Sequence, residues 1–336
     1  MRYNWPLIGN PQVQDYFARA FSGGKVHHAY LFEGPEHVGK ATFARMLART
    51  LLCETNHPTP LLEKEGKRLV PCGACRGCTA FDHGTHPDVV TLTREEDAAS
   101  ISIEATRDFI HSLATTALLG SVKIGMIEEA ELLHGEAANV LLKTLEEPAR
   151  GVVIFLISHT LLLATIASRC QRIRFGFAAS GDIVKALEGD VHAEELSELA
   201  SGRPGVAIAM RDDLEARVVH EKKAREMLEI FSRDEGARML WSAAQFGKGR
   251  VVAEKRLELH EYLDIAESVL RDALLTGCGA QVRLAHEFVR EEIVQYASAR
   301  GAQEIGATLA RVSWARHYLA ANVDPQSVSD YLFLGA

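Results

Sequence analysis

Short apolar runs alternate with stretches of helical periodicity along the first half of the chain. A buried strand is predicted at 28–34, and further strands are predicted at 88–93, 122–128, 152–158 and 170–175. Apolar residues at helical spacing predict helices at 39–52, 101–114, 133–146 and 160–168. Ser102 is the expected N-cap of the second of these helices. Buried strands separated by helices indicate an α/β fold with a parallel sheet covered on both faces.

The strand pattern disappears from about residue 178 onward. Short helical segments are predicted at 181–189, 194–201 and 204–213, and long helical periodicities fill 215–333. A chain of 336 residues exceeds the size at which single cores stop growing, about 250–300 residues. We therefore expect an α/β core over 1–176, a small helical domain over 177–213 and an all-helical domain over 214–336.

The composition is that of an ordinary globular protein, with 47% hydrophobic residues and a mean hydropathy of −0.03. A net charge of −8 and a pI near 6.0 exclude a polycation that binds nucleic acid through its whole surface. The start of the chain lacks a basic segment followed by an apolar one, so we expect no signal peptide. The longest apolar runs, 152–157 and 161–167, are too short to span a bilayer. We expect a cytoplasmic protein with no membrane partner.

The segment GPEHVGKAT (34–42) almost matches the phosphate-binding pattern G-x-x-x-x-G-K-[ST]. It follows a predicted strand and opens a predicted helix, so its amides and Lys40 are placed as a nucleotide loop requires. Gly34 and Gly39 are present, but Ala41 replaces the hydroxyl residue that normally binds Mg²⁺. Thr42 comes one residue late and is turned by about 100° along the helix. The loop is predicted to keep its shape and to lose its metal ligand.

A nucleotide site of this kind also needs an acidic pair at the end of a neighbouring strand. The sequence offers Glu128 and Glu129 where Asp-Glu is usual. Glu129 is placed as the water-activating carboxylate, whereas the longer Glu128 would shift the metal. The alternative is that these glutamates form only a solvated acidic start of a helix. The two departures at Ala41 and Glu128 predict a nucleotide-type fold without competent hydrolysis.

Four of the cysteines are grouped as Cys53 and the run Cys72, Cys75 and Cys78. Thiolates spaced C-x₂-C-x₂-C, with one more from a helix end, suit a structural Zn²⁺ that would hold together an insertion at about 53–79. An iron–sulfur cluster is the alternative, because the same spacing begins ferredoxin motifs, but no Cys-Pro follows. Disulfides are not expected in a reducing compartment.

Several segments together resemble the bacterial DNA polymerase III clamp loader, a family of the AAA+ class. They are HHAYLFEGP (27–35), the four-cysteine insertion, AANVLLKTLEEP (137–148) and ATIASRC (164–170). The resemblance is dense over 1–175. Beyond about 178 it depends mainly on helical pattern and length.

This resemblance implies that Arg169, within Ser168-Arg169-Cys170, is an arginine finger. Such a finger acts in trans on the γ-phosphate held by a neighbouring subunit. The resemblance also assigns Ser158 to a polar sensor position. It also implies that residues 214–336 join a collar of equivalent domains. Long amphipathic helices alone indicate only a bundle core, so the collar role depends on the resemblance.

The family contains motor subunits and non-motor subunits. Motor subunits normally carry Thr after the loop lysine, a DEAD-like acidic sequence and a sensor arginine, where this chain has Ala41, EEAE (128–131) and Gly205, with Arg203 two residues away. We therefore expect a non-motor subunit, with ATP binding left open. The implied partners are gamma/tau-type and delta-type subunits, the sliding clamp, primer–template DNA and the polymerase III holoenzyme. The alternatives are an ATP-hydrolysing motor or other AAA+ remodelling ATPase, and a zinc-dependent nucleic-acid-binding protein outside any ring.

Overall fold

The structure is a computed structural model that describes residues 5–56, 70–95, 98, 100–249, 251–321 and 323–334. It divides into two compact units, Met1–Asp182 and Ile183–Ala336. Each unit has its own hydrophobic core. The predicted subdivision of the second half at residue 214 stays a prediction.

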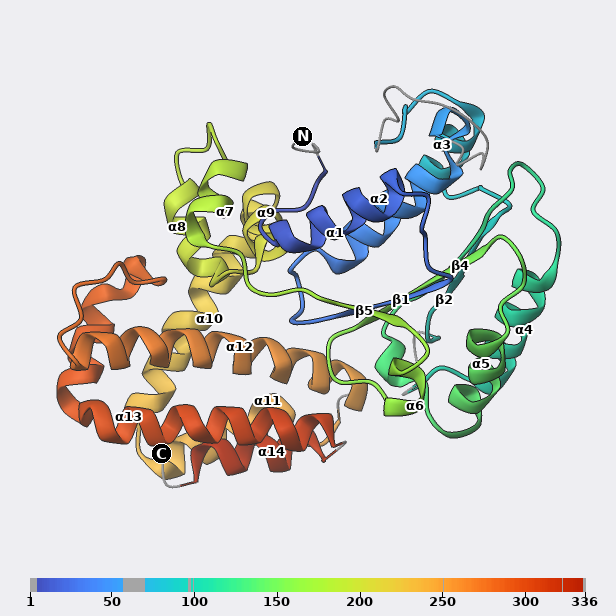
Figure 1. The fold of residues 1–336 in the computed structure, drawn as a ribbon. Helices are drawn as coiled ribbons and strands as arrows, with labels where there is room; N and C mark the ends of the chain where they lie inside the picture. Colours follow the sequence, from blue (N-terminus) through green and yellow to red (C-terminus); the bar gives the residue numbers. More distant parts are fainter. Residues whose placement is uncertain are drawn as a thin grey trace. The chain divides into compact units, whose positions relative to one another are not determined.

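The first unit contains a parallel five-stranded sheet in the order β2-β3-β4-β1-β5 (Figure 1). The strands are β1 (Ala29–Glu33), β2 (Val89–Leu92), β3 (Lys123–Ile127), β4 (Val152–Ser158) and β5 (Gln171–Arg174). Every residue of β1, β3 and β4 is buried, so the predicted parallel sheet with both faces covered is confirmed. Glu33 of β1 pairs in register with Ser158 of β4, so the loops that follow these two strands begin side by side.

Helices cover the two faces of this sheet separately (Figure 1). One face packs against α1 (Pro11–Ser22) and α2 (Lys40–Leu52), with Phe17, Phe32 and Phe43 in edge-to-face or tilted contact. The other face packs against α4 (Ile103–Ala114) and α5 (Gly135–Glu146). The expected cap of α4 is confirmed, because the Ser102 hydroxyl accepts a hydrogen bond from the Ala105 amide at 3.1 Å.

Shorter elements complete this unit, and some of them were not predicted. They are η1 (Glu54–Asn56), α3 (Arg76–Asp82), η2 (Ala130–Leu132) and α6 (Ala164–Ala167). No helix is predicted from the sequence at α1 or at α3. Helix α3 begins inside the cysteine run, where glycines obscure the helical pattern.

The second unit is all-helical in its described residues, as the sequence predicts. The chain enters it through α7 (Ser180–Ala186), followed by α8 (Ala193–Ala200), α9 (Pro204–Asp212), α10 (Leu214–Ser232), α11 (Glu235–Phe246), α12 (Val252–Gly277), η3 (Glu287–Val289), α13 (Arg290–Ala320) and α14 (Pro325–Phe333). Its core includes an aromatic cluster in which Trp241 meets Tyr262 and Phe333 edge-on. A non-helical residue, Gly301, interrupts α13 with φ 74°.

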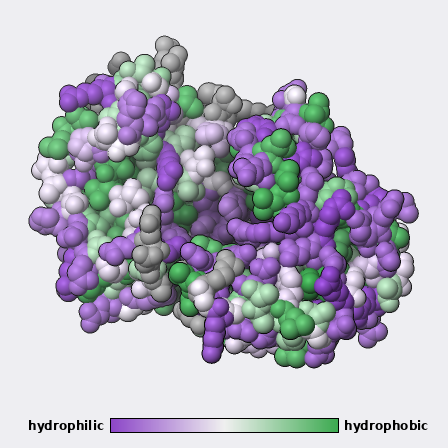
Figure 2. All heavy atoms as spheres, turned by 180° about the vertical axis from the view of Figure 1, so that it is seen from behind, coloured by the Kyte–Doolittle hydropathy of each residue, from purple (hydrophilic) through white to green (hydrophobic). Residues whose placement is uncertain are grey.

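The surface mixes hydrophilic residues with scattered hydrophobic ones, as the face in Figure 2 shows. Exposed large hydrophobic residues occur in both units, for example Leu161 and Trp314. Among the described helices, none is long and apolar enough to cross a membrane.

A buried polar chain connects three elements inside the helical unit. The amide and Nδ1 of His286 both bond Asp272 Oδ2, at 2.8 and 3.1 Å, and both side chains are fully buried. A carboxylate only accepts, so Nδ1 of His286 carries the proton and Nε2 can accept from His220 Nε2, 3.3 Å away. Burial, with the neighbouring His286 and Lys223, lowers the pKa of His220 to about 4.

This arrangement predicts that the chain loses stability in mild acid. The pKa of His220 is lower in the folded state than in the unfolded state, so its contribution is complete above about pH 6.5 and is lost as the pH falls toward 4. At pH 5 the loss is about 1–2 kcal/mol. Urea unfolding at pH 7.5 and pH 5 measures it, and His220→Gln should reduce the pH dependence. An equal pH dependence in that variant would show that other groups cause it.

Candidate functional site

The loop between β1 and α2 has a backbone that only glycine accommodates at two positions. Gly34 has φ 145°, and a Cβ atom there would lie 2.2 Å from the carbonyl oxygen of Phe175. Gly39, the N-cap of α2, is left-handed with φ 93°. The two glycines of the motif therefore specify the shape of a phosphate-type loop.

Lys40 is turned into this loop and is only 3% exposed. Its ammonium donates to the carbonyl oxygens of Gly34, at 2.7 Å, and of Pro35, and it lies 3.1 Å from Nδ1 of His159. Burial lowers the pKa of Lys40 to about 8. An ammonium group has three N–H donors, and these three partners account for all of them. Lys40 therefore bonds the loop and His159, and none of its N–H groups is left for a phosphate.

His159 was not predicted as part of the site. It follows Ser158, and the register of β4 with β1 brings it to the loop. Its backbone amide also bonds Glu131 Oε1 at 3.1 Å. The only signal in the sequence was its position directly after a predicted strand. That position indicates a place in the site only when the strand order puts β4 beside β1.

The hydroxyl groups proposed for the site lie elsewhere. Ala41 is partly buried against the core, and Thr42 is exposed on the surface of α2. Ser158, the sensor-like residue, is fully buried, and its hydroxyl donates to the carbonyl of Thr160 at 2.7 Å. The partners found for Lys40 thus include neither Thr42 nor Ser158.

Each glutamate of the acidic pair forms an ion pair with an arginine. Glu128 Oε1 accepts from Arg45 Nη2 of α2 at 2.7 Å, and Glu129 Oε2 accepts from Arg94 Nε at 3.1 Å. Glu129 also has left-handed backbone angles, with φ 53°. Cationic partners hold both carboxylates, so their charge is already compensated without Mg²⁺.

Arg169 lies on the surface of the same unit, in the turn between α6 and β5. Its Nε donates to Glu146 Oε1 at 2.7 Å, and its Nη1 donates to the carbonyl of Thr165 at 2.7 Å. Ser168 caps the end of α6. Burial, with the nearby Glu33, raises the pKa of the Cys170 thiol to about 12, so Cys170 acts in packing rather than as a nucleophile.

The four grouped cysteines come together as the sequence predicts. Their sulfur atoms all lie within 4.8 Å of one another, and the pairs Cys72–Cys78 and Cys53–Cys75 are each 4.0 Å apart. Four Zn–S bonds of about 2.3 Å in a tetrahedron place sulfur atoms about 3.8 Å apart. These distances fit a tetrahedral metal ion.

Local structure fixes each cysteine of this cluster. Cys53 ends α2, Cys75 caps α3, and the amides of Cys72, Cys75 and Cys78 donate to cysteine sulfur atoms at 3.3–3.4 Å. Amides of Ala74 and Cys75 lower the pKa of Cys72 to about 6, whereas burial raises that of Cys78 to about 12. Burial therefore disfavours the charged form of Cys78. All four are free cysteines, and residues 57–69 of the insertion lie outside the described residues.

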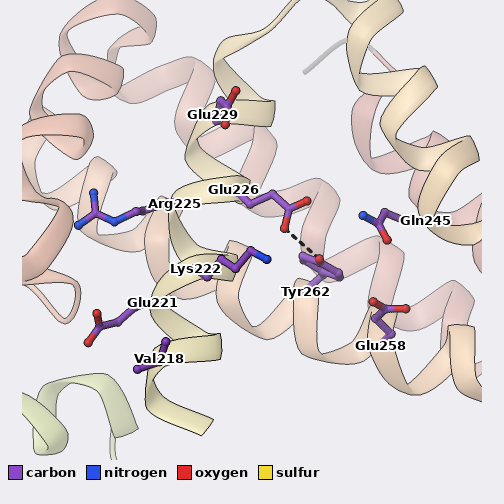
Figure 3. Close-up of a pocket in the computed structure, with 9 residues that line it drawn as sticks. All are labelled: Val218, Glu221, Lys222, Arg225, Glu226, Glu229, Gln245, Glu258 and Tyr262. Atoms are coloured by element: carbon purple, nitrogen blue, oxygen red, sulfur yellow. Dashed lines mark hydrogen bonds between the residues drawn. The ribbon is translucent and has the colours of Figure 1, made fainter. Parts of the chain in front are cut away.

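The helical unit contains a separate groove of about 760 Å³ between α10, α11 and α12 (Figure 3). Figure 3 shows the Glu226 carboxylate directed at the Tyr262 hydroxyl, 3.1 Å away, and Glu226 also accepts from Trp241 Nε1. None of the predicted site residues lines this groove. Arg203, near the missing sensor position at Gly205, lies 3.7 Å from Asp264 in the same unit.

Comparison with known proteins supports the resemblance found in the sequence. The delta' subunit of Pseudomonas aeruginosa DNA polymerase III is 36% identical over 61% of this chain and 60% of its own length. The tau subunit of Escherichia coli is 32% identical over 66% of this chain, which corresponds to 29% of tau. The delta' subunit of Bacillus subtilis is 26% identical over 99% of this chain and 98% of its own. The matched region thus spans less than two thirds of the first two relatives.

The family described as DNA polymerase III, delta subunit, matches residues 9–178. This region contains the sheet, the loop around Lys40, the cysteine cluster and Arg169. The match covers half of the sequence, and the chain belongs to the DNA polymerase III delta subunit family, with delta' subunits among its relatives.

Proposed function

We propose that this chain is the non-motor delta' subunit of a DNA polymerase III clamp loader. In this role it supplies Arg169 to ATP held by a neighbouring subunit and helps to load the sliding clamp onto primed DNA. One contrast carries the proposal. The loop of the chain is closed on Lys40, while Arg169 remains at the surface, 32% exposed in its side chain. The chain is built to act on another subunit's nucleotide.

The runner-up function is an ATP-hydrolysing motor, which the similarity to tau subunits favours. Three observations oppose it. Ala41 offers no oxygen to Mg²⁺, the Glu128 and Glu129 carboxylates are paired with arginines, and the three donors of Lys40 are engaged. Opening the loop would expose the buried ammonium and break its hydrogen bonds before a phosphate could bind.

The proposal predicts no ATP turnover by the chain alone. MgATP added to the isolated chain should give neither hydrolysis nor a binding signal by calorimetry, because the loop lacks its metal ligand and its lysine is engaged. Adding the chain to a gamma/tau-type partner should raise the turnover of that partner. Magnesium-dependent turnover by the isolated chain would establish the motor function instead. Nucleotide binding without turnover would leave the trans role intact but show that the loop opens.

The proposed partners follow from this role. Within a clamp loader the chain would contact gamma/tau-type and delta-type subunits, with residues 214–336 in a collar. The complex would act on the sliding clamp and primer–template DNA within the polymerase III holoenzyme. With a net charge of −8, the chain would touch DNA only through local contacts to the phosphate backbone.

We also propose that Cys53, Cys72, Cys75 and Cys78 hold a structural Zn²⁺. The support is the spacing of the four sulfur atoms. A closed four-thiolate site leaves no open coordination position, so the metal would stabilise the end of α2 against α3 and take no part in catalysis.

A further inference from the structure

The guanidinium of Arg169 is bonded along one edge. Its Nε and Nη2 both donate to Oε1 of Glu146, the last residue of α5, and the Nε contact is 2.7 Å. Its Nη1 donates to the carbonyl of Thr165 at 2.7 Å. A further contact from Nη1 to the Ser168 hydroxyl, at 3.4 Å, is longer than an ordinary hydrogen bond. The glutamate therefore holds the side of the guanidinium that carries Nε.

A guanidinium has five N–H groups in a fixed plane. The contacts to Glu146 use the Nε–H and one N–H of Nη2, and the contact to Thr165 uses one N–H of Nη1. One N–H on each terminal nitrogen is left. These two N–H groups are the outer fork of the guanidinium, the donors available to two oxygens of a phosphate.

The base of this arrangement is rigid. Leu145, next to Glu146, is buried in the core, and its carbonyl lies 3.0 Å from Nε2 of His28. A carbonyl can only accept, so this His28 nitrogen carries the proton. The amide of Glu147 closes the helix end by bonding the Lys143 carbonyl at 3.0 Å. The backbone next to Glu146 is therefore held at the start of β1.

We propose that Glu146 is a positioning residue for Arg169. Its carboxylate fixes the inner edge of the guanidinium, so that the outer fork is presented, already oriented, to a phosphate of the nucleotide on a second subunit. This inference rests on the proposed trans role of Arg169. As an exposed ion pair, the contact contributes little to folding. Its value lies in orientation, because a displaced finger loses transition-state contacts.

The test measures ATP turnover by a motor-type partner mixed with variants of the full chain. At the one site that Arg169 is proposed to serve, Glu146→Ala should lower kcat about tenfold with little change in KM. Glu146→Gln keeps an oxygen for the Nε–H, and should lose only about threefold. Glu147→Ala, at the exposed neighbouring position, is the matched control and should behave as the unmodified chain. Size-exclusion chromatography confirms that each variant still assembles.

A double-mutant cycle separates positioning from other roles. Glu146→Ala should have no further effect once Arg169→Ala is present, because the two residues act as one unit. Increased turnover with Glu146→Ala would show that the glutamate competes with phosphate for the arginine, and unchanged turnover would show an idle surface pair. Either result overturns the inference. No effect of Arg169→Ala itself would instead reject the proposed trans function.

Discussion

Arg169→Ala should abolish most ATP hydrolysis at the neighbouring site that we propose this arginine serves. Arginine fingers contribute roughly 10³-fold or more to kcat by stabilising charge on the transferring phosphoryl group. In a ring with several ATP sites, the total rate should fall by the share of that one site. The loss should appear in kcat rather than KM, since the finger acts in the transition state. Steady-state ATPase assays of the reconstituted complex measure both.

Two further substitutions make this result specific. Arg174→Ala removes an exposed arginine from the neighbouring strand β5 and should leave turnover unchanged. Arg169→Lys keeps the charge but lacks the planar fork, and should recover only a minor part of the rate. Full activity with Arg169→Lys would indicate that a nearby charge suffices. Equal losses with Arg169→Ala and Arg174→Ala would point to impaired assembly.

Cys78→Ser should reduce the metal content from one ion per chain to essentially none. Cys78 is fully buried, and its sulfur is one of the four that would hold the metal. Because ligand binding and local folding are coupled, the free energy of unfolding should fall by more than about 3 kcal/mol. Elemental analysis measures the metal, and urea unfolding measures the stability.

The control for this prediction is Cys278→Ser. Cys278 is an exposed cysteine at the end of α12 in the other unit, and its loss should change neither metal content nor stability. A colourless protein with zinc supports the proposed site. Iron with visible absorbance would show that the cysteines hold an iron–sulfur cluster and not zinc. Full stability without any metal would refute a structural metal.

Most strands and helices of the first unit could be predicted from the sequence. Runs such as VVIFLIS are apolar at every position but the last, and β4 has the bounds that this run predicts. Spacing alone also indicated the cysteine cluster, because short intervals around glycines restrict where thiolates can lie. The Ser102 cap was recognisable because a hydroxyl directly preceding an apolar helical pattern satisfies a free amide.

The pairings that decide how the site works were not predictable in this way. His159 reaches Lys40 across 119 positions of sequence, and Glu146 reaches Arg169 across 23. Both contacts depend on strand order and on the exact helix end, which hydrophobic periodicity does not specify. The pairing of Arg45 with Glu128 and of Arg94 with Glu129 could not be predicted either, since charged surface residues carry no periodic signal.

We propose that this chain serves the nucleotide of a neighbour and needs none of its own. The most direct measurement compares Lys40→Gln with Arg169→Ala in the same reconstituted complex, using single-turnover ATP hydrolysis. Glutamine keeps donors for the loop carbonyls, so the fold of the loop should survive. We expect unchanged hydrolysis with Lys40→Gln and a loss of roughly 10³-fold at one site with Arg169→Ala. A loss with Lys40→Gln and none with Arg169→Ala would contradict it.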